Sequence, residues 1–380
     1  MEVYFDNAAT TVVYPEVKEL MIKLMEEDYG NPSSFHMKGV KAENYIKEAR
    51  NQISKHIKCQ EKELVFTSGG TESNNLAIIG GALAKRRAGK HIITTGIEHA
   101  SVRETMEFLS REGFEISYVD VDETGRVDLE HLKSLIRDDT ILVSTMYVNN
   151  EIGTIEPIAD IAEIIHEKNK SALYHVDGVQ AFGKLTFSPK KLGVDLFSIS
   201  GHKIHGPKGS GALYIKDGVH IKPIIYGGGQ QKAMRSGTEN VPAIAGMGLA
   251  ADIIYTNHSE RIEKIKSIKD SFIEKVTRFE KVFNNSGCAP HIASISFVGV
   301  RSEVLLHALE DRGIYVSAGS ACSSNKPHAS NVLTAIKLPK EQLESTLRFS
   351  FSEFNNMDEV DYTLKVIEEL LPTLRRYVRK

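Results

Sequence analysis

The segment SISGHKIHGPKGSG, residues 198–211, has the features of a site for a reactive lysine. A strand-like stretch ends at Ser200, and Lys203 follows in a turn rich in Gly, Ser and His. A lysine amine that is held in place and shielded from water can form a Schiff base with an aldehyde cofactor. A lysine taken alone is most often a solvated surface residue, but the strand and the Gly-Pro-Lys-Gly turn favour a reactive one here.

Asp177 ends the apolar stretch ALYHVD, upstream of Lys203. An aspartate at the carboxyl end of a parallel strand can face the ligand crevice and pair with a protonated pyridine nitrogen. Asp is also a favoured helix N-cap, and Asp177 alone does not separate the two interpretations. Its combination with Lys203 favours the pairing with a pyridine nitrogen.

The segment FTSGGTESNN, residues 66–75, reads as a strand, a glycine turn and the start of a helix. Backbone N–H groups and the helix dipole at such a turn can hold a phosphate. The segment lacks the GxxxxGK[ST] spacing of an ATP-binding loop, which disfavours a nucleoside triphosphatase. Further candidate phosphate donors are Ser200, His202 and Thr238.

His99 lies in GIEHAS, directly after another strand-like segment. A lone histidine is more often structural than catalytic. The sharper alternative is an imidazole that stacks on a cofactor ring and moves protons near neutral pH.

These groups require a scaffold that places strand ends together, and the chain alternates short apolar strands with amphipathic helices from residue 15 to about 250. This alternation predicts βαβ units and a mostly parallel sheet, with ligands at the carboxyl ends of the strands. Pro15 is expected to open the first helix and Gly30 to close it. We predict a large α/β domain over residues 13–257 and a smaller α+β domain formed by residues 1–12 and 258–380.

The bulk composition is that of a globular protein with two domains, since the chain has 380 residues, 41% of them hydrophobic and 26% charged. The formal net charge of −3 gives no basic field for a nucleic acid. Three cysteines with no CxxC pair suggest neither a disulfide framework nor a metal site. The N-terminus does not read as a signal peptide, and we find no membrane-length apolar run. We expect a cytoplasmic protein.

Ten segments occur in the order seen in one enzyme family, and together they extend from residue 4 to about 352. By these segments the chain resembles the NifS/IscS-type cysteine desulfurases, which belong to the class V aminotransferase group of fold-type-I pyridoxal 5′-phosphate (PLP) enzymes. The segments are YFDNAATT, GNPSSFHMKG, FTSGGTESNN, EHAS, VNNEIGT, HVDGVQ, SGHKIHGPKG, MRSGTEN, SAGSACSS and TLRFSFS.

The resemblance implies a role for each matched residue. Lys203 binds PLP covalently, Asp177 pairs with the pyridine nitrogen and His99 stacks on the ring. Arg348 grips the substrate carboxylate with a planar guanidinium. The resemblance also places Asn150 and Gln180 near the phenolic oxygen of the ring and the substrate, and assigns the phosphate to Gly70, Thr71, Ser200, His202 and Thr238, the last from the partner subunit of a homodimer.

Cys322 is the diagnostic residue of the resemblance. It lies in the polar segment SAGSACSSNKPHAS, a composition typical of a loop with little apolar core in which to bury a thiol. The resemblance implies that Cys322 takes sulfur from L-cysteine as a persulfide and leaves alanine. Cys59 and Cys288 lack such a context and are interpreted as incidental.

Two segments depart from the family pattern: Gln231, Lys232 and Ala233 replace the usual residues before the RSGT motif, and His328-Ala329 replaces a Glu-Pro pair. Selenocysteine lyase activity and another class V aminotransferase activity stay open as alternatives, as does a non-catalytic scaffold. The expected partners are L-cysteine, a second copy of the chain and a sulfur-acceptor protein, such as an iron–sulfur scaffold or a tRNA-thiolation enzyme. No direct nucleic-acid or membrane partner is expected.

Overall fold

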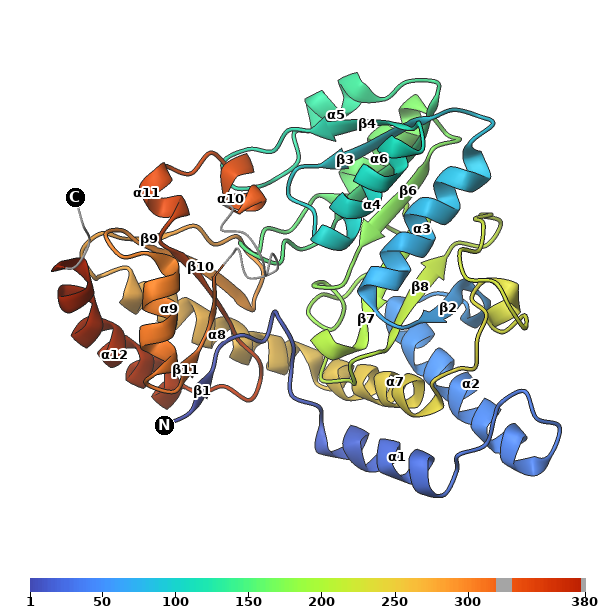
Figure 1. Cartoon of the computed structure of the whole chain (residues 1–380), viewed down its shortest axis with the longest axis horizontal. Helices are drawn as coiled ribbons and strands as arrows, with labels where there is room; N and C mark the ends of the chain where they lie inside the picture. The colour runs from blue at the N-terminus through green and yellow to red at the C-terminus, as the bar shows by residue number, and fades with distance from the viewer. Residues whose placement is uncertain (319–329, 377–380) are drawn as a thin grey trace.

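The computed structural model describes residues 1–318 and 330–376, and its centre is a seven-stranded sheet (Figure 1). The strand order is β2-β8-β7-β6-β5-β3-β4. Only β8 runs antiparallel to its neighbours β2 and β7. The predicted mostly parallel sheet is therefore confirmed. The strands are β2 (Leu64–Thr67), β3 (His91–Thr95), β4 (Glu115–Val119), β5 (Thr140–Met146), β6 (Leu173–Asp177), β7 (Leu196–Ser200) and β8 (Gly211–Ile215).

Helices cover both faces of this sheet, so that neighbouring side chains of a strand are buried in different cores. Phe197 of β7 packs with α2, α6 and α7, whereas its neighbour Leu196 packs with α3 and α4. Leu64 and Val65 of β2 divide in the same way. The helices are α1 (Pro15–Glu26), α2 (Met37–Ile57), α3 (Gly70–Lys85), α4 (Ala100–Arg111), α5 (Leu129–Leu135), α6 (Ile158–Lys168) and α7 (Val241–Tyr255).

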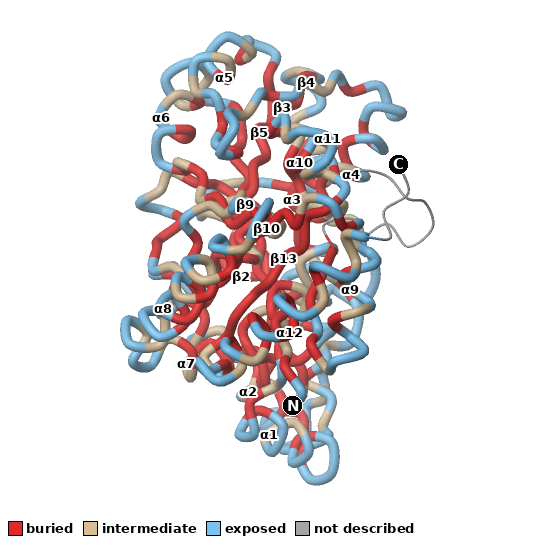
Figure 2. The backbone as a smooth tube through the Cα atoms, turned by 90° about the vertical axis from the view of Figure 1, so that its left-hand side faces the viewer, coloured by how far each residue is buried: buried red, intermediate tan, exposed pale blue. Residues whose placement is uncertain are grey.

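The C-terminal part forms a separate core around the four-stranded sheet β12-β13-β10-β9. Val3 and Phe5 of the N-terminal segment are buried in this core, and β1 (Val3–Tyr4) pairs with β11 (Ile314–Tyr315). The red buried tube in Figure 2 runs through both cores. The other elements are α8 (His258–Val276), β9 (Val282–Asn284), β10 (Ile292–Phe297), α9 (Ser302–Glu310), β12 (Ser317–Ala318), α10 (Asn331–Ala335), α11 (Lys340–Leu343), β13 (Thr346–Ser350) and α12 (Met357–Arg376).

Gly30 does not end the first helix, so that prediction is wrong. Helix α1 ends at Glu26, and the backbone N–H of its C-cap Glu27 donates to the carbonyl oxygen of Lys23. A Cβ at Gly30 would lie 2.1 Å from the carbonyl oxygen of Lys38, so glycine is needed here for a close backbone approach. Pro15 does open α1, as predicted.

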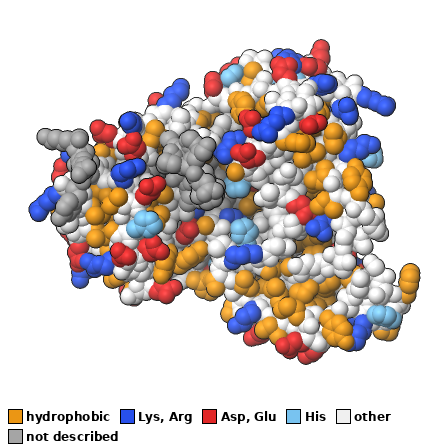
Figure 3. Space-filling model, in the orientation of Figure 1, with side chains coloured by type: hydrophobic (Ala, Val, Ile, Leu, Met, Phe, Trp, Pro, Cys, Tyr) orange, Lys and Arg blue, Asp and Glu red, His pale blue; other side chains and the backbone are white. Residues whose placement is uncertain are grey.

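Large apolar side chains are exposed over α1, α2 and the loop between them, at the lower right of Figure 3. A protein surface of this kind marks an interaction site when such side chains gather together. No described helix has the length and apolar character needed to cross a membrane. The exposed apolar residues of this surface are Ile22, Met25, Tyr29, Phe35, Met37 and Val40.

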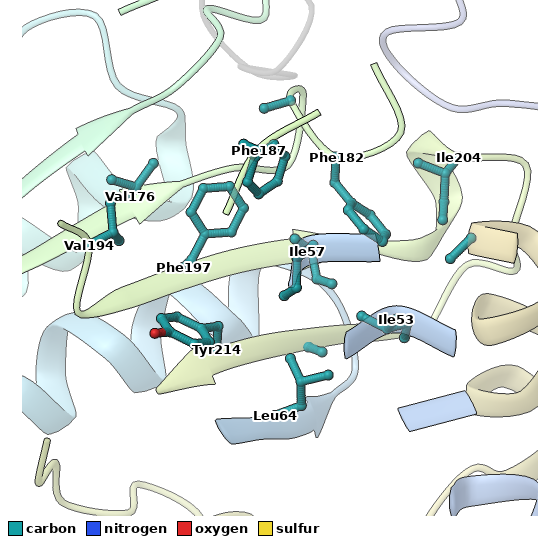
Figure 4. Packing of buried hydrophobic residues seen from close by; sticks show 14 of the residues in the cluster. Ile53, Ile57, Leu64, Val176, Phe182, Phe187, Val194, Phe197, Ile204 and Tyr214 are labelled. Carbon is teal, nitrogen blue, oxygen red and sulfur yellow. The ribbon is translucent and has the colours of Figure 1, made fainter. Parts of the chain in front are cut away.

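The strands that carry the site rest on a layer of large side chains (Figure 4). Phe197 and Phe187 pack with ring centroids 4.7 Å apart beneath β6 and β7. Gly178, directly after β6, lies so close that a Cβ there would meet the Phe197 ring at 2.0 Å. This close packing fixes the carboxyl end of β6, where Asp177 lies.

Candidate active site

A cavity of about 490 Å³ lies at the carboxyl ends of the parallel strands, and we call it the central cavity. Its walls come from the segments that follow β2, β3, β5, β6 and β7, together with the N-terminal segment and β13. This is the position at which open α/β sheets bind ligands. Ten predicted site residues line it: Gly70, Thr71, His99, Asn150, Asp177, Gln180, Ser200, His202, Lys203 and Arg348.

Two predicted site residues are not placed there. Thr238 is exposed and does not line the central cavity of this chain. Its assignment to a partner subunit stays a prediction. Cys322 and the pair His328-Ala329 lie outside the described residues.

Lys203 ends the short 3-10 turn Gly201–Lys203, which directly follows β7. Its Nζ donates to the carbonyl oxygens of Ala8 at 2.5 Å and Ala9 at 2.7 Å. The carbonyl of Lys203 in turn accepts a hydrogen bond from the buried Lys184 amine at 3.3 Å. The N-terminal segment is therefore part of the site, a contact that the sequence did not predict.

Asp177 is 5% exposed, and both of its carboxylate oxygens are held. Oδ2 accepts from Asn74 Nδ2 at 2.8 Å, and Oδ1 accepts from the backbone N–H of Val179 at 3.0 Å. The carboxylate thus caps the turn after β6 and also lines the central cavity. Turns rather than a helix directly follow Asp177, so the helix N-cap interpretation is wrong, and the pairing of Asp177 with a pyridine nitrogen stays a prediction.

His99 is the N-cap of α4 and lines the central cavity as well. Its Nδ1 accepts from the backbone N–H of Ser101 at 3.1 Å, so the neutral imidazole carries its proton on Nε2. Burial lowers the pKa of His99; the nearby Asp177 carboxylate opposes this shift and Lys203 adds to it. A neutral imidazole with an Nε2 proton is a hydrogen-bond donor toward the cavity.

The N-terminus of α3 has the features of a phosphate site. Gly69 adopts φ of 150° and ψ of −175°, a region that only glycine occupies readily. The Ser200 hydroxyl is buried and has no hydrogen-bond partner in the described part of the chain, and it lies 3.9 Å from the position a Gly69 Cβ would take. Burial lowers the pKa of His202 to about 4, so this ring is neutral. An unpartnered hydroxyl beside a helix N-terminus fits an anionic oxygen.

Arg348 reaches the central cavity from β13 of the smaller sheet. Its NH2 group pairs with Asp6 Oδ1 at 2.8 Å, and its NH1 group donates to the carbonyl of Asn150 at 2.8 Å. These two contacts fix the plane of the guanidinium. Asp6 lies in the YFDNAATT motif but has no assigned role in the sequence prediction.

Two carboxyl groups next to predicted site residues, one buried and one half-buried, were also missed. Glu98 is 4% exposed, and burial raises its pKa to about 8. Glu151 follows Asn150, accepts a hydrogen bond from Ser330, and has its pKa raised to about 7 by burial. Glu98 lies in the motif EHAS and Glu151 lies in the motif VNNEIGT. Their place in these motifs is the only signal that the sequence offers for them.

The two described cysteines differ in environment. Burial raises the pKa of the Cys59 thiol to about 12, so this residue is unreactive as a thiolate, whereas Cys288 is exposed. Within residues 1–318 and 330–376, no group of three or more His, Cys, Asp or Glu is arranged to hold a metal ion.

The departing residues Gln231, Lys232 and Ala233 adopt positive φ values of 47°, 59° and 60°. The Gln231 side chain accepts from Arg50 at 2.9 Å and donates to Glu239 at 3.1 Å. These residues do not line the central cavity, so the departure alters the surface next to the RSGT motif.

Comparison with known proteins gives a consistent family. The family model for class V aminotransferases matches residues 3–363. The cysteine desulfurase IscS of Dictyoglomus turgidum is 45% identical over 98% of this chain and 95% of its own length. A solved NifS-like protein superposes with a TM-score of 0.94 at 41% identity, covering 98% of this chain and all of that one. A solved complex of SspA with cysteine has a TM-score of 0.83 at 33% identity, covering 93% of this chain and all of that one. The chain therefore belongs to the class V aminotransferase family and, within it, to the IscS/NifS cysteine desulfurases.

Proposed function

We propose that the central cavity holds PLP and that the chain uses it to take sulfur from L-cysteine. The observation that carries this proposal is the set of groups that meet in one cavity: the buried Ser200 hydroxyl beside the α3 N-terminus, which has no hydrogen-bond partner among the described residues, the Asp177 carboxylate and the Lys203 amine. A phosphate, a protonated ring nitrogen and an aldehyde each match one of these groups. Gly70, Thr71 and His202 would complete the phosphate site, and Gln180 and Asn150 would lie against the ring substituents.

The residues of this chain have separate tasks in the proposed reaction. Bound PLP supplies an electron sink that weakens bonds at the carbons of an amino acid substrate. Arg348 binds the carboxylate of L-cysteine, and its contacts with Asp6 and Asn150 keep the guanidinium in one orientation. Lys203 carries a proton at Nζ, which the Ala8 and Ala9 carbonyls hold in place. His99 accepts a hydrogen bond at Nδ1, which leaves the Nε2 proton to be donated to a group in the cavity.

Cys322 is the proposed sulfur acceptor. Its thiolate attacks the sulfur of L-cysteine, and the electron pair of the breaking carbon–sulfur bond stays with the carbon, which gains a proton so that the carbon skeleton leaves as alanine. The transferred sulfur remains on Cys322 as a persulfide. The outer sulfur of this persulfide then passes to an acceptor protein, an iron–sulfur scaffold or a tRNA-thiolation enzyme. Such thiol chemistry requires a reducing compartment, and we infer a cytoplasmic location.

The proposed assembly is a homodimer. The exposed apolar side chains over α1 and α2 form a surface that a second copy would bury (Figure 3). Thr238 is exposed on this chain and would reach the phosphate site of the partner.

The test is incubation of the PLP-loaded protein with L-cysteine and a reductant, with sulfide and alanine quantified together. Equal amounts of sulfide and alanine support the proposal. If neither forms although PLP is bound, selenocysteine is tested next, and its cleavage would identify a selenocysteine lyase. Transfer of the amino group to an added keto acid without sulfide would instead identify an aminotransferase. If the protein did not bind PLP at all, the non-catalytic scaffold would be the interpretation that fits.

A further inference from the structure

Asn74 connects two groups of the central cavity that no sequence motif links. It lies near the N-terminus of α3 and is 1% exposed. Its Nδ2 donates one hydrogen bond to Asp177 Oδ2 at 2.8 Å and another to Ser101 Oγ at 2.9 Å. A side-chain amide has two N–H donors, so both are used.

The orientation of this amide is fixed by its surroundings. If the amide were rotated by half a turn, its oxygen would face the Asp177 carboxylate, and the two acceptors would repel each other. In the observed orientation the Asn74 oxygen is buried with no hydrogen-bond partner in the part of the chain that the structure describes. A buried unpaired oxygen destabilises the fold. A residue that served packing alone would be more favourable as a leucine, so the amide nitrogen is the group that this position requires.

The hydrogen bonds from Asn74 continue to His99. Because Ser101 Oγ accepts from Asn74, its hydroxyl hydrogen is available to His99 Nδ1, which lies 2.9 Å away. The backbone N–H of Ser101 donates to the same nitrogen at 3.1 Å. The chain of contacts therefore runs from Asp177 through Asn74 and Ser101 to His99.

We propose that Asn74 is a positioning residue for the cofactor: its amide holds the carboxylate of Asp177 toward the ring nitrogen and, through Ser101, fixes the imidazole of His99 against the ring. This inference rests on the proposed roles of Asp177 and His99. Asn74 bonds Asp177 and Ser101, and its effect on the ring passes through Asp177 and His99.

The Asp177 carboxylate depends on Asn74 because it has few other donors. Its described hydrogen-bond donors are the Asn74 amide and the backbone N–H of Val179, one for each oxygen. Loss of the Asn74 donor leaves one buried carboxylate oxygen without a hydrogen bond, so the carboxylate is held at one oxygen only and its orientation is no longer fixed. A misoriented Asp177 pairs less well with a protonated ring nitrogen, so PLP should bind more weakly by about 10-fold.

The test compares three substitutions in the full-length protein. Asn74→Leu removes both hydrogen bonds at similar volume. Ser101→Ala removes only the hydroxyl link to His99 and leaves the Asn74 contact with Asp177. Asn75→Leu is the matched control, because Asn75 is half-buried beside Asn74 and bonds only the Thr71 carbonyl of its own helix among described residues. Apoprotein of each variant is titrated with PLP, and the visible circular dichroism of bound PLP reports the ring's orientation.

We expect Asn74→Leu to raise the dissociation constant of PLP about 10-fold and to change the visible circular dichroism band. Ser101→Ala should change the band but raise the dissociation constant less than threefold, and Asn75→Leu should match the wild type. Equal PLP affinity and equal spectra for Asn74→Leu and Asn75→Leu would overturn the inference. So would an affinity loss in Ser101→Ala as large as that in Asn74→Leu.

Two measurements keep this test decisive. If Asn74→Leu fails to fold, judged by far-ultraviolet circular dichroism of the apoprotein, Asn74→Ala removes the same donors without added bulk and carries the same expectation. The wild type is titrated alongside. If the wild type itself does not bind PLP, the proposed function fails; if it binds PLP and the Asn74 variants bind equally well, only the inference about Asn74 fails.

Discussion

Glu98 should make the stability of this protein depend on pH in a way that one substitution removes. Its Oε1 accepts from Thr95 Oγ1 at 2.7 Å and from the backbone N–H of Met146 at 2.9 Å, while Oε2 is buried with no partner among the described residues. Burial raises the pKa of Glu98 from 4.5 to about 8. Glu98→Gln keeps the acceptor oxygen and removes the charge.

The sign follows from proton binding. Between pH 4.5 and 8 the folded protein binds more protons at Glu98 than the unfolded chain does, so the free energy of unfolding falls as the pH rises. One unit of pKa corresponds to about 1.4 kcal/mol. The loss is on the order of 1 kcal/mol at pH 5.5 and about 5 kcal/mol at pH 8.5, so the two differ by roughly 3 to 4 kcal/mol. The Gln side chain of Glu98→Gln does not ionise, so the variant does not lose this free energy. Its stability relative to the wild type should therefore rise with pH.

Thermal melting at the two pH values measures this difference. With an unfolding entropy of about 2.1 cal/mol/K per residue, the expected gain of Glu98→Gln over the wild type is about 4 °C larger at pH 8.5 than at pH 5.5. Glu107→Gln, on the exposed face of α4, is the control and should show no such change with pH. A melting difference for Glu98→Gln that is the same at both pH values would refute the reasoning, because Glu98 would then be ionised at the same pH in both states.

Four further outcomes are expected. Cys322→Ser should abolish sulfide release from L-cysteine while PLP stays bound, and Cys288→Ser should release sulfide like the wild type. Arg348→Lys should raise KM for L-cysteine by about 10-fold or more with a smaller change in kcat, because the planar fork that binds a carboxylate is lost. Burial lowers the pKa of Lys184 from 10.5 to about 8, so Lys184→Met should raise the melting temperature at pH 7, and this gain should shrink as the pH rises from 8 to 10.5. Phe35→Glu should shift the protein toward a monomer in light scattering, whereas an unchanged mass would exclude the α1–α2 surface as the interface.

The positions of the strand-end residues could be predicted from sequence because each follows a short apolar strand. Asp177, Ser200 and His99 all have this context, and the structure places all three at one cavity. The direction of a strand is harder to read. The segment GALYI of β8 has a composition like that of the parallel strands of the same sheet. It nevertheless runs antiparallel to β7, because the chain turns back after Lys203 and β8 returns beside β7.

Contacts made by backbone atoms escaped prediction for a different reason. Lys203 bonds the carbonyls of Ala8 and Ala9, and carbonyls are the same in every residue, so the residue types carry no signal. Glu98 and Asn74 escaped because their roles depend on burial and on partners from other elements. The role of Cys322 and the assignment of Thr238 to the partner subunit rest on the family resemblance.

The contacts of the N-terminal segment also bear on how the protein is made. Val3 pairs with Ile314, and Ala8 donates its backbone N–H to Ser350, so the segment that holds the Lys203 amine is anchored to strands near the other end of the chain. Contacts between residues so distant in sequence form late in folding, because closing such long loops is entropically unfavourable. During synthesis the sheet that carries Lys203 can assemble before β11 and β13 leave the ribosome, but Val3 gains its strand partner only when β11 has emerged. A segment synthesised before the large sheet is therefore anchored only after that sheet can form, and the lysine site is complete only once β13 has been made.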